Sequence, residues 1–513
     1  MKKVFKENWA FIIVCSFFAV YYLYRMLAMA PWYDELYTYI EFIDRGAWYS
    51  MTNWPAPNNH IFFSVSSTLA DLFGTYIGLR GISFLAAVST LVVLYLLLKD
   101  ACSPQIALFG VMTYGMFFLV NNLAVQGRGY SLATFFLVMA MYSGYHICYK
   151  VAERKYYILW ALSLCLGLYT LISSLYWVCA VCICCGLILL LMKHKKKLLN
   201  LIAASACAAV STFILYSIMW LSMGAQRLIE TEYPGASPIR MVFEHPRACL
   251  MWGINFMRTD RNLQGFGRDV FLRDFQFFGR DILNAFINVQ SIPVFYVFVI
   301  IVVVMTLLFF SLVIYAKKKK VELENMPALF IVSFAGISFL CVFLCLFIQS
   351  DYPFTRVFSF LGVFLCMILC VFAVLIKYAV GKVKSIRKKV NWFGLINIPI
   401  FVIAIFVLTS AKYNYEYDYV DYYAADAIAH AELKESTMYL ACDVYAKQQV
   451  VYHYEIGKDM ELVEEKTEPE VIIIRNEGIT GSWYDLISPE EYAGLWVEER
   501  EIIYENQIYR VYR

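Results

Sequence analysis

Charged residues are scarce in this chain. Only 16% of its 513 residues are Asp, Glu, Lys or Arg, whereas 61% are apolar and 18% are aromatic. A soluble domain carries more charge on its surface, and a disordered or nucleic-acid-binding chain is far more polar. The composition therefore excludes these classes, and with them a nucleic-acid partner. It indicates an integral membrane protein whose first partner is the lipid bilayer.

The few charges are unevenly distributed along the chain. Residues 411–513 hold 22 of the 40 acidic residues but only 9 of the 43 basic ones, so this tail is near −13 and the remainder near +16. The chain is thus a basic, apolar body followed by an acidic tail. We predict two domains, a transmembrane body at 1–410 and a small extracytoplasmic domain at 411–513.

Eleven apolar runs are candidate membrane-spanning helices, because about 20 apolar residues cross the roughly 30 Å hydrocarbon core. Lysine-rich segments follow alternate runs and place the N-terminus in the cytoplasm, so that an odd number of spans places the tail outside. The first run resembles a signal peptide, but its length and Pro31 directly after an Ala-Met-Ala sequence favour an uncleaved anchor. The predicted spans are residues 9–30, 77–98, 104–123, 131–149, 156–173, 175–192, 198–220, 292–316, 327–349, 357–378 and 392–410.

Two long segments, 31–76 and 221–291, face the outer side in this topology and are the expected location of a site. Lysine is absent from the second, which contains eight Arg and seven acidic residues. A segment whose basic residues are all Arg favours bidentate recognition of carboxylate or phosphate. Arg258 and Arg261 are candidates for this role. The alternative, which the counts favour for most of these residues, is pairing between Arg and acids within the segment.

The tail has the pattern of a small α/β domain, with no phosphate loop, no GxGxxG and no metal-ligand spacing. A packing role or guidance of an acceptor is the expectation for it. The predicted strands are residues 438–441, 450–454, 471–475, 502–504 and 508–512, and the predicted helices are residues 424–435 and 488–495.

Two adjacent carboxylates, Asp34 and Glu35, follow the first span among aromatic residues. Charge is expensive at this depth, and burial among aromatics moves a carboxyl group toward the range useful for a general base. In a helix the two side chains diverge by about 100°, so one acts and the other supports it. The alternative is an ordinary helix N-terminus with acids that balance its dipole.

The sequence Pro57-Asn58-Asn59-His60 precedes an apolar stretch, 61–73, that is too short to span and is expected in the membrane interface. Asn58 or Asn59 is a natural N-cap for that helix. His60 can bind a phosphate or a substrate hydroxyl, can join a carboxylate as a ligand of a divalent metal, or can belong to the cap. With no second His nearby, a dedicated zinc site is not expected, and no cofactor is firmly indicated.

Several of these elements occur in an order that resembles a known family. They are a Lys-flanked first helix, the Asp34-Glu35 pair with Tyr37, the 57–60 turn, Phe73-Gly74, residues 79–83, residues 126–132 with Arg128 and Tyr130, and residues 354–358 with Arg356. Together they resemble the polytopic GT-C glycosyltransferases. The likeness is strongest to the branch of the protein O-mannosyltransferases and the lipid A aminoarabinose transferase, over residues 9–150 and more loosely over 350–378.

The resemblance implies a sugar donor carried on polyprenyl phosphate and a glycan, lipid or protein acceptor on the extracytoplasmic face. Asp34 is the candidate base, and with no second opposed carboxylate a single inverting displacement is expected. Arg128 and Arg356, with Arg80 behind them, are the candidate phosphate ligands; Asn59, His60 and Tyr130 complete the expected substrate contacts. The alternative for each Arg is an interfacial anchor.

Other functions remain open at the level of the sequence. A polysaccharide polymerase or ligase that uses lipid-diphosphate donors would share the spans and the Arg-rich segment, but it would not need the Asp34-Glu35 pair. A lipid or sugar transporter would explain the many spans, yet it should show discontinuous helices or matching halves. A non-catalytic scaffold requires no carboxylates beside the first helix.

Overall fold

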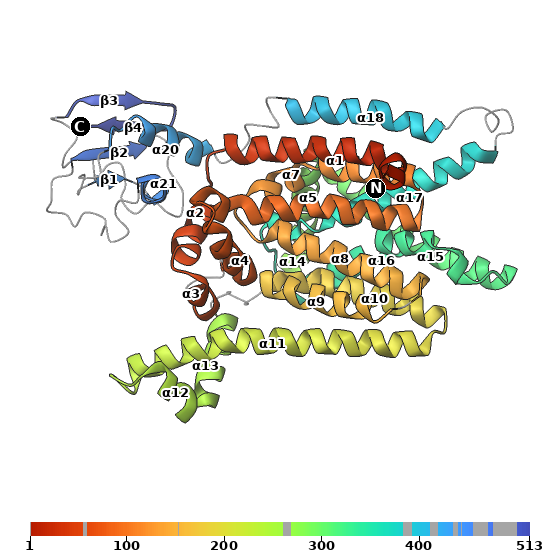
Figure 1. The fold of residues 1–513 in the computed structure, drawn as a ribbon, viewed down its shortest axis with the longest axis horizontal. Helices are drawn as coiled ribbons and strands as arrows, with labels where there is room; N and C mark the ends of the chain where they lie inside the picture. The colour runs from red at the N-terminus through yellow and green to blue at the C-terminus, as the bar shows by residue number, and fades with distance from the viewer. Residues whose placement is uncertain are drawn as a thin grey trace.

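The computed structural model describes residues 2–54, 59–151, 153–259, 268–382, 392–410, 419–433, 440–442, 444–454, 470–475 and 500–513. Most of this chain is helical, and long apolar helices run side by side in a bundle (Figure 1). The protein is a multi-pass membrane protein. In the described residues, eight helices are long and apolar enough to cross a membrane, or nine if one bent pair is a single span.

The spanning helices account for most of the predicted apolar runs. They are α1 (Lys2–Ala28), α5 (Thr75–Ala101), α8 (Tyr130–Tyr149), α10 (Leu175–Leu191), α11 (Lys195–Thr231), α15 (Ile292–Lys319), α16 (Ala328–Gln349) and α17 (Leu361–Lys382), and the bent pair is α6 (Pro104–Met116) with α7 (Phe118–Val125). The predicted count of eleven is not confirmed. In the described chain, α9 (Arg154–Thr170) is not among the candidate spans, and the apolar part of α18 (Trp392–Thr409), Ile396–Thr409, is shorter than a span.

The break between α6 and α7 is the main departure from the predicted spans. The two helices meet at 74°, although the sequence reads as one continuous apolar run. Phe117 has an extended conformation, with ψ of 130°. Asn121 donates from its side chain to the carbonyls of Gly115 and Phe117, which satisfies backbone groups that the interrupted helix leaves free.

Short helices fill the two long segments that connect spans. The first holds α2 (Tyr33–Thr38), a π-helical turn at Tyr39–Ile43, α3 (Ala47–Thr52) and α4 (Ile61–Asp71), and the second holds α12 (Pro238–Glu244), α13 (Pro246–Thr259) and α14 (Arg268–Ile287). A helix is therefore present as α4 within the predicted stretch 61–73. Short 3-10 turns lie at Ile172–Ser174, Leu323–Asn325 and Thr355–Phe358.

The described part of the tail contains a four-stranded sheet in the order β1-β2-β4-β3, in which β1 and β2 are parallel and the other pairs are antiparallel. Its elements are α20 (Tyr419–Ala429), β1 (Leu440–Cys442), α21 (Val444–Tyr454), β2 (Val471–Arg475), β3 (Ile502–Glu505) and β4 (Tyr509–Tyr512).

One predicted strand of the tail, 450–454, is wrong. These residues form the end of the helix α21, which buries Ala446 and Val450 in the same apolar cluster as α20. The two residues are four positions apart and share a helix face, and a short apolar run does not distinguish that spacing from a strand. The predicted helix at 488–495 lies outside the described residues.

Candidate active site

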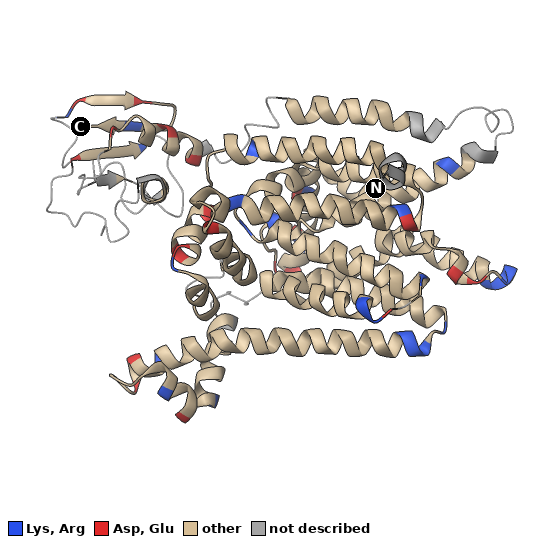
Figure 2. Ribbon diagram, in the orientation of Figure 1, with Lys and Arg blue, Asp and Glu red and all other residues tan. Residues whose placement is uncertain are grey.

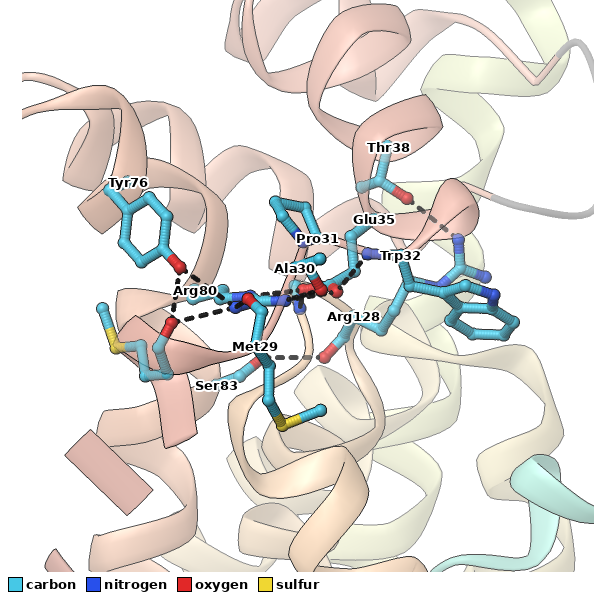
Figure 3. Close-up of polar contacts among 12 residues, drawn as sticks. Met29, Ala30, Pro31, Trp32, Glu35, Thr38, Tyr76, Arg80, Ser83 and Arg128 are labelled. Atoms are coloured by element: carbon cyan, nitrogen blue, oxygen red, sulfur yellow. Dashed lines mark hydrogen bonds and ion pairs between the residues drawn. The ribbon is translucent and has the colours of Figure 1, made fainter. Parts of the chain in front are cut away.

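The predicted carboxylate pair lies on α2, directly after the turn that ends α1, and Figure 3 shows the contacts of Glu35. Glu35 is 1% exposed and is enclosed by donors on every side. Arg80 Nε and Nη2 each lie 2.8 Å from its carboxylate oxygens, and the backbone N–H groups of Trp32 and Gly127 also donate to it. With both oxygens occupied, Glu35 is placed to hold the segment rather than to accept a proton from a substrate.

Arg80 is fully used within the protein. Besides Glu35, its guanidinium donates to the carbonyls of Met26 and Met29 from Nη1 and of Ala30 from Nη2, at 2.7–3.0 Å. The side chain is completely buried. It satisfies the carbonyls that the end of α1 leaves free, so no N–H remains for a lipid phosphate. Arg80 thus forms a C-terminal cap on α1, and its predicted phosphate contact would have to displace these bonds.

Asp34 points away from Glu35, as expected for adjacent helical residues. Its side chain is 11% exposed, and its Oδ2 lies 3.1 Å from Arg356 Nη2 and 3.8 Å from Arg128 Nη2. In the described chain Oδ2 accepts no hydrogen bond of good geometry. The carboxylate is thus charge-paired, but it retains a lone pair that can take a proton.

Arg128 is buried beside Asp34, and not all of its N–H groups are hydrogen-bonded within the described chain. Its Nη1 donates to the backbone carbonyl of Asp34 at 3.0 Å and to Thr38 Oγ1 at 2.9 Å. Its Nε has no partner among the described residues, and its Nη2 lies 3.4 Å from His60 Nε2. A buried cation with unpaired N–H groups is costly unless an anion completes it.

Arg356, on the 3-10 turn before α17, also reaches Asp34. Its guanidinium lies 5.0 Å from the ring centre of Trp32 and 4.5 Å from that of Phe354, and its side chain is 27% exposed. Stacking orients the cation without using its in-plane N–H groups. The two predicted phosphate ligands, Arg128 and Arg356, therefore converge on the same carboxylate from residues more than 200 positions apart.

His60 and Tyr130 lie beside Arg128. The backbone N–H of Gly129 donates to His60 Nδ1 at 2.8 Å, which assigns the proton of a neutral ring to Nε2. Nε2 and Arg128 Nη2 then present two adjacent donors, an arrangement that favours an anionic oxygen. The ring of Tyr130 meets that of His60 edge to face at 5.1 Å.

Asn59 serves the fold rather than a substrate. Its Nδ2 donates to the carbonyls of Ser50 and Asn53 at 2.8 and 2.9 Å, and its Oδ1 accepts from Ser64 Oγ at 3.2 Å. The side chain is 3% exposed. These bonds tie α3 to the start of α4 and use both N–H groups of the Asn59 amide, so neither is free for the predicted substrate contact. Asn58 lies outside the described residues.

Sequence reasoning missed two residues that build the site. Gly127 brings its backbone N–H to Glu35, and a Cβ there would lie 2.5 Å from the carbonyl oxygen of Leu79. Thr38 holds Arg128 through its hydroxyl. Gly127 lies within the motif that contains Arg128. A glycine in such a motif can indicate that the backbone there lies close to another part of the chain, and this was the available signal. Nothing in the sequence around Thr38 marks its role.

In the second long segment, arginines pair with neighbouring acids. The ion pairs are Arg227–Glu230, Arg240–Glu244, Arg273–Asp274 and Arg280–Asp281. This is the alternative that the sequence offered for most of them. Arg261 lies outside the described residues, as does the side chain of Arg258. Within the described chain, no group of three His, Cys, Asp or Glu residues lies close enough to hold a metal ion.

Comparison with solved structures identifies the architecture. No family model matches the sequence, and no curated protein sequence matches it. ArnT from Cupriavidus metallidurans bound to undecaprenyl phosphate superposes with a TM-score of 0.53 at 10% identity, over 98% of this chain and 97% of that one, and its apo state gives 0.54. The chain has the GT-C fold. An Archaeoglobus fulgidus oligosaccharyltransferase tethered to an acceptor peptide also matches, with a TM-score of 0.42 at 13% identity, over 91% of this chain and 61% of that one.

The GT-C fold extends beyond the residues that carried the resemblance in sequence. Those residues covered 9–150 and part of 350–378, whereas the match to ArnT covers nearly the whole chain. At 10% identity the likeness defines the arrangement of helices and not the chemistry of the site. The chemistry has to be argued from Asp34, Arg128, Arg356 and His60 as they lie in this protein.

Proposed function

We propose that the protein is a membrane glycosyltransferase that moves a sugar from a polyprenyl-phosphate donor to an acceptor hydroxyl. The observation that carries this proposal is the Asp34 carboxylate, which lies between Arg128 and Arg356 with an oxygen that accepts no hydrogen bond in the described chain. One group can take a proton, and the two beside it can hold a phosphate. The solved ArnT structure with undecaprenyl phosphate shows that a protein of this fold binds such a lipid.

In the proposed reaction, the acceptor oxygen attacks the anomeric carbon of the donor sugar. The bond from that carbon to the phosphate oxygen breaks, the lipid phosphate departs with the electron pair, and Asp34 takes the hydroxyl proton. Of the adjacent pair, Asp34 is the available carboxylate, because Glu35 is occupied by Arg80. A single displacement inverts the anomeric configuration. A positioned base contributes roughly 10² to 10⁴ in rate.

Arg128, Arg356 and His60 are the proposed ligands of the phosphate, and Tyr130 lies beside Arg128 and His60. The leaving phosphate gains negative charge as the bond breaks, so fixed N–H donors stabilise the transition state more than the ground state. In the resting state Arg356 pairs with Asp34 at 3.1 Å. Donor binding would draw Arg356 to the phosphate and leave Asp34 as the base.

The proposed orientation places the site outside the cytoplasm. Figure 2 shows the lysine-rich start of α11 and end of α15 at the end of the bundle opposite α2. Lysine-rich ends favour the cytoplasmic side. Nucleotide sugars are cytoplasmic, so an outward site needs a donor that has crossed the membrane, as a lipid-linked sugar does. We further propose that 1–410 is the catalytic domain and that the tail is an extracytoplasmic α/β domain.

A direct assay tests the proposal. Purified protein is incubated with a series of polyprenyl-phosphate sugars and a mixed acceptor preparation, and release of the lipid phosphate is measured. Release that requires both acceptor and intact protein supports transfer. If no phosphate is released from any donor but release occurs from lipid-diphosphate sugars, the protein is instead a polymerase or ligase.

A transporter remains the second candidate because one observation favours it. The bent α6–α7 pair is a discontinuous helix of the kind common at transport sites. Here, however, α7 leads into residues 126–128 and delivers Arg128 to Asp34. Movement of an intact labelled lipid-linked sugar across proteoliposomes, without cleavage of its phosphate bond, would favour transport over transfer.

A further inference from the structure

The turn between α1 and α2, residues 28–33, has its backbone groups held by side chains. Arg80 collects three carbonyls at the end of α1, and Glu35 accepts from the N–H group of Trp32. The carbonyl of Pro31 accepts a hydrogen bond of 2.8 Å from Gln449 Nε2, and both side chains are buried. Among these contacts, the one to Gln449 comes from the tail.

Gln449 lies on α21, which packs against α2 (Figure 1). The rings of Tyr33 and Tyr445 lie 5.2 Å apart, and those of Tyr39 and Tyr452 meet edge to face at 5.3 Å. Burial raises the pKa of the Tyr452 hydroxyl well above its ordinary value. Tyr445 and Tyr452 of α21 therefore bring neutral rings to α2 and to the π-helical turn that follows it, and the amide of Gln449 reaches the Pro31 carbonyl.

We infer that Gln449 is a positioning residue for Asp34, and that the tail is part of the catalytic unit. This inference rests on the proposed function of Asp34. Asp34 lies only three residues after Pro31. A displacement of the Pro31 carbonyl would therefore also displace the first turn of α2, which contains Asp34. There the carboxylate must stay between Arg128 and Arg356.

Loss of the amide donor leaves the Pro31 carbonyl buried and unpaired, and the turn moves to find another partner. A displacement of about 1 Å at a reacting group lowers turnover by roughly 10²-fold. The backbones of Arg128 and Arg356 belong to other elements, directly before α8 and on the 3-10 turn before α17, so the two guanidinium groups stay near the site and donor binding persists. The expected signature is a fall in kcat with little change in KM for the donor.

The test compares two neighbouring variants of the full-length protein. Gln449→Met keeps the length of the side chain and removes the donor. Gln448→Met makes the same change one position earlier, at a side chain that makes no hydrogen bond to α2 among the described residues. We expect kcat for sugar transfer to fall roughly 10- to 100-fold in Gln449→Met and to change less than about twofold in Gln448→Met. Gln449→Asn retains the amide on a shorter arm and should give an intermediate kcat.

The outcomes separate this inference from the proposed function. Normal kcat in Gln449→Met overturns the positioning role even if Asp34→Asn is inactive. A raised KM with unchanged kcat also overturns it, because the tail would then act on substrate binding. If Gln449→Met fails to fold, the decision passes to Gln449→Asn, in which wild-type kcat overturns the role. Full transfer activity in Asp34→Asn would instead refute the proposed function itself.

Discussion

Replacement of Glu35 by Gln is predicted to destabilise the protein strongly, because it removes one charge from a fully buried ion pair. Glu35 and Arg80 are both 1% exposed in their side chains and meet through two contacts of 2.8 Å. The amide of Gln keeps the shape but leaves the guanidinium without a counter-charge. Loss of one partner of a buried pair costs about 3–5 kcal/mol.

A surface pair provides the matched control for this prediction. Glu41 and Arg45 form an ion pair at 3.2 Å, with side chains 26% and 46% exposed. Glu41→Gln should therefore cost at most about 1 kcal/mol. Reversible unfolding in mixed detergent micelles measures the free energy of unfolding of both variants. If the free energy of unfolding of Glu35→Gln is within about 1 kcal/mol of the wild-type value, the buried pair does not hold α1 to α2 and the reasoning fails.

Three further predictions follow from the same contacts. Arg356→Ala should leave thermal stability near wild type, because the side chain is 27% exposed, and should lower kcat/KM for the donor by roughly 10²-fold; unchanged donor kinetics would exclude a phosphate role. Gly127→Ala should reduce the yield of folded protein, since the new Cβ would meet the Leu79 carbonyl oxygen at 2.5 Å, and a normal size-exclusion profile with normal yield would contradict this. Asn59→Ala should cost about 1–3 kcal/mol in the free energy of unfolding by leaving buried carbonyls unpaired, with little effect on donor KM in the protein that remains folded.

Much of the site was predictable because its signals are local. Two acids beside the end of an apolar helix are rarely accidental, and the same reasoning pointed to Arg128 and Arg356 at predicted helix ends. The division of roles was not predictable. Glu35 and Arg80 are 45 positions apart, and only the folded chain shows that they pair with each other.

The departures in the fold have similarly long-range or ambiguous causes. The α6–α7 break depends on Asn121 turning back to carbonyls of the preceding residues, and no Pro marks the position. The helix α21 depends on packing against α20 and α2, whereas its apolar residues alone fit a strand equally well. The intrinsic preference of these residues for helix or strand is weak, and tertiary contacts determine which of the two forms.

The most direct test of the account is the rate of sugar transfer by Asp34→Asn, compared with Asp44→Asn as an exposed acid of the same segment. With a polyprenyl-phosphate sugar as donor, Asp34→Asn should still bind the lipid phosphate and should lose transfer by roughly 10² to 10⁴, while Asp44→Asn should transfer normally. Wild-type transfer by a folded, membrane-inserted Asp34→Asn protein would contradict the central claim.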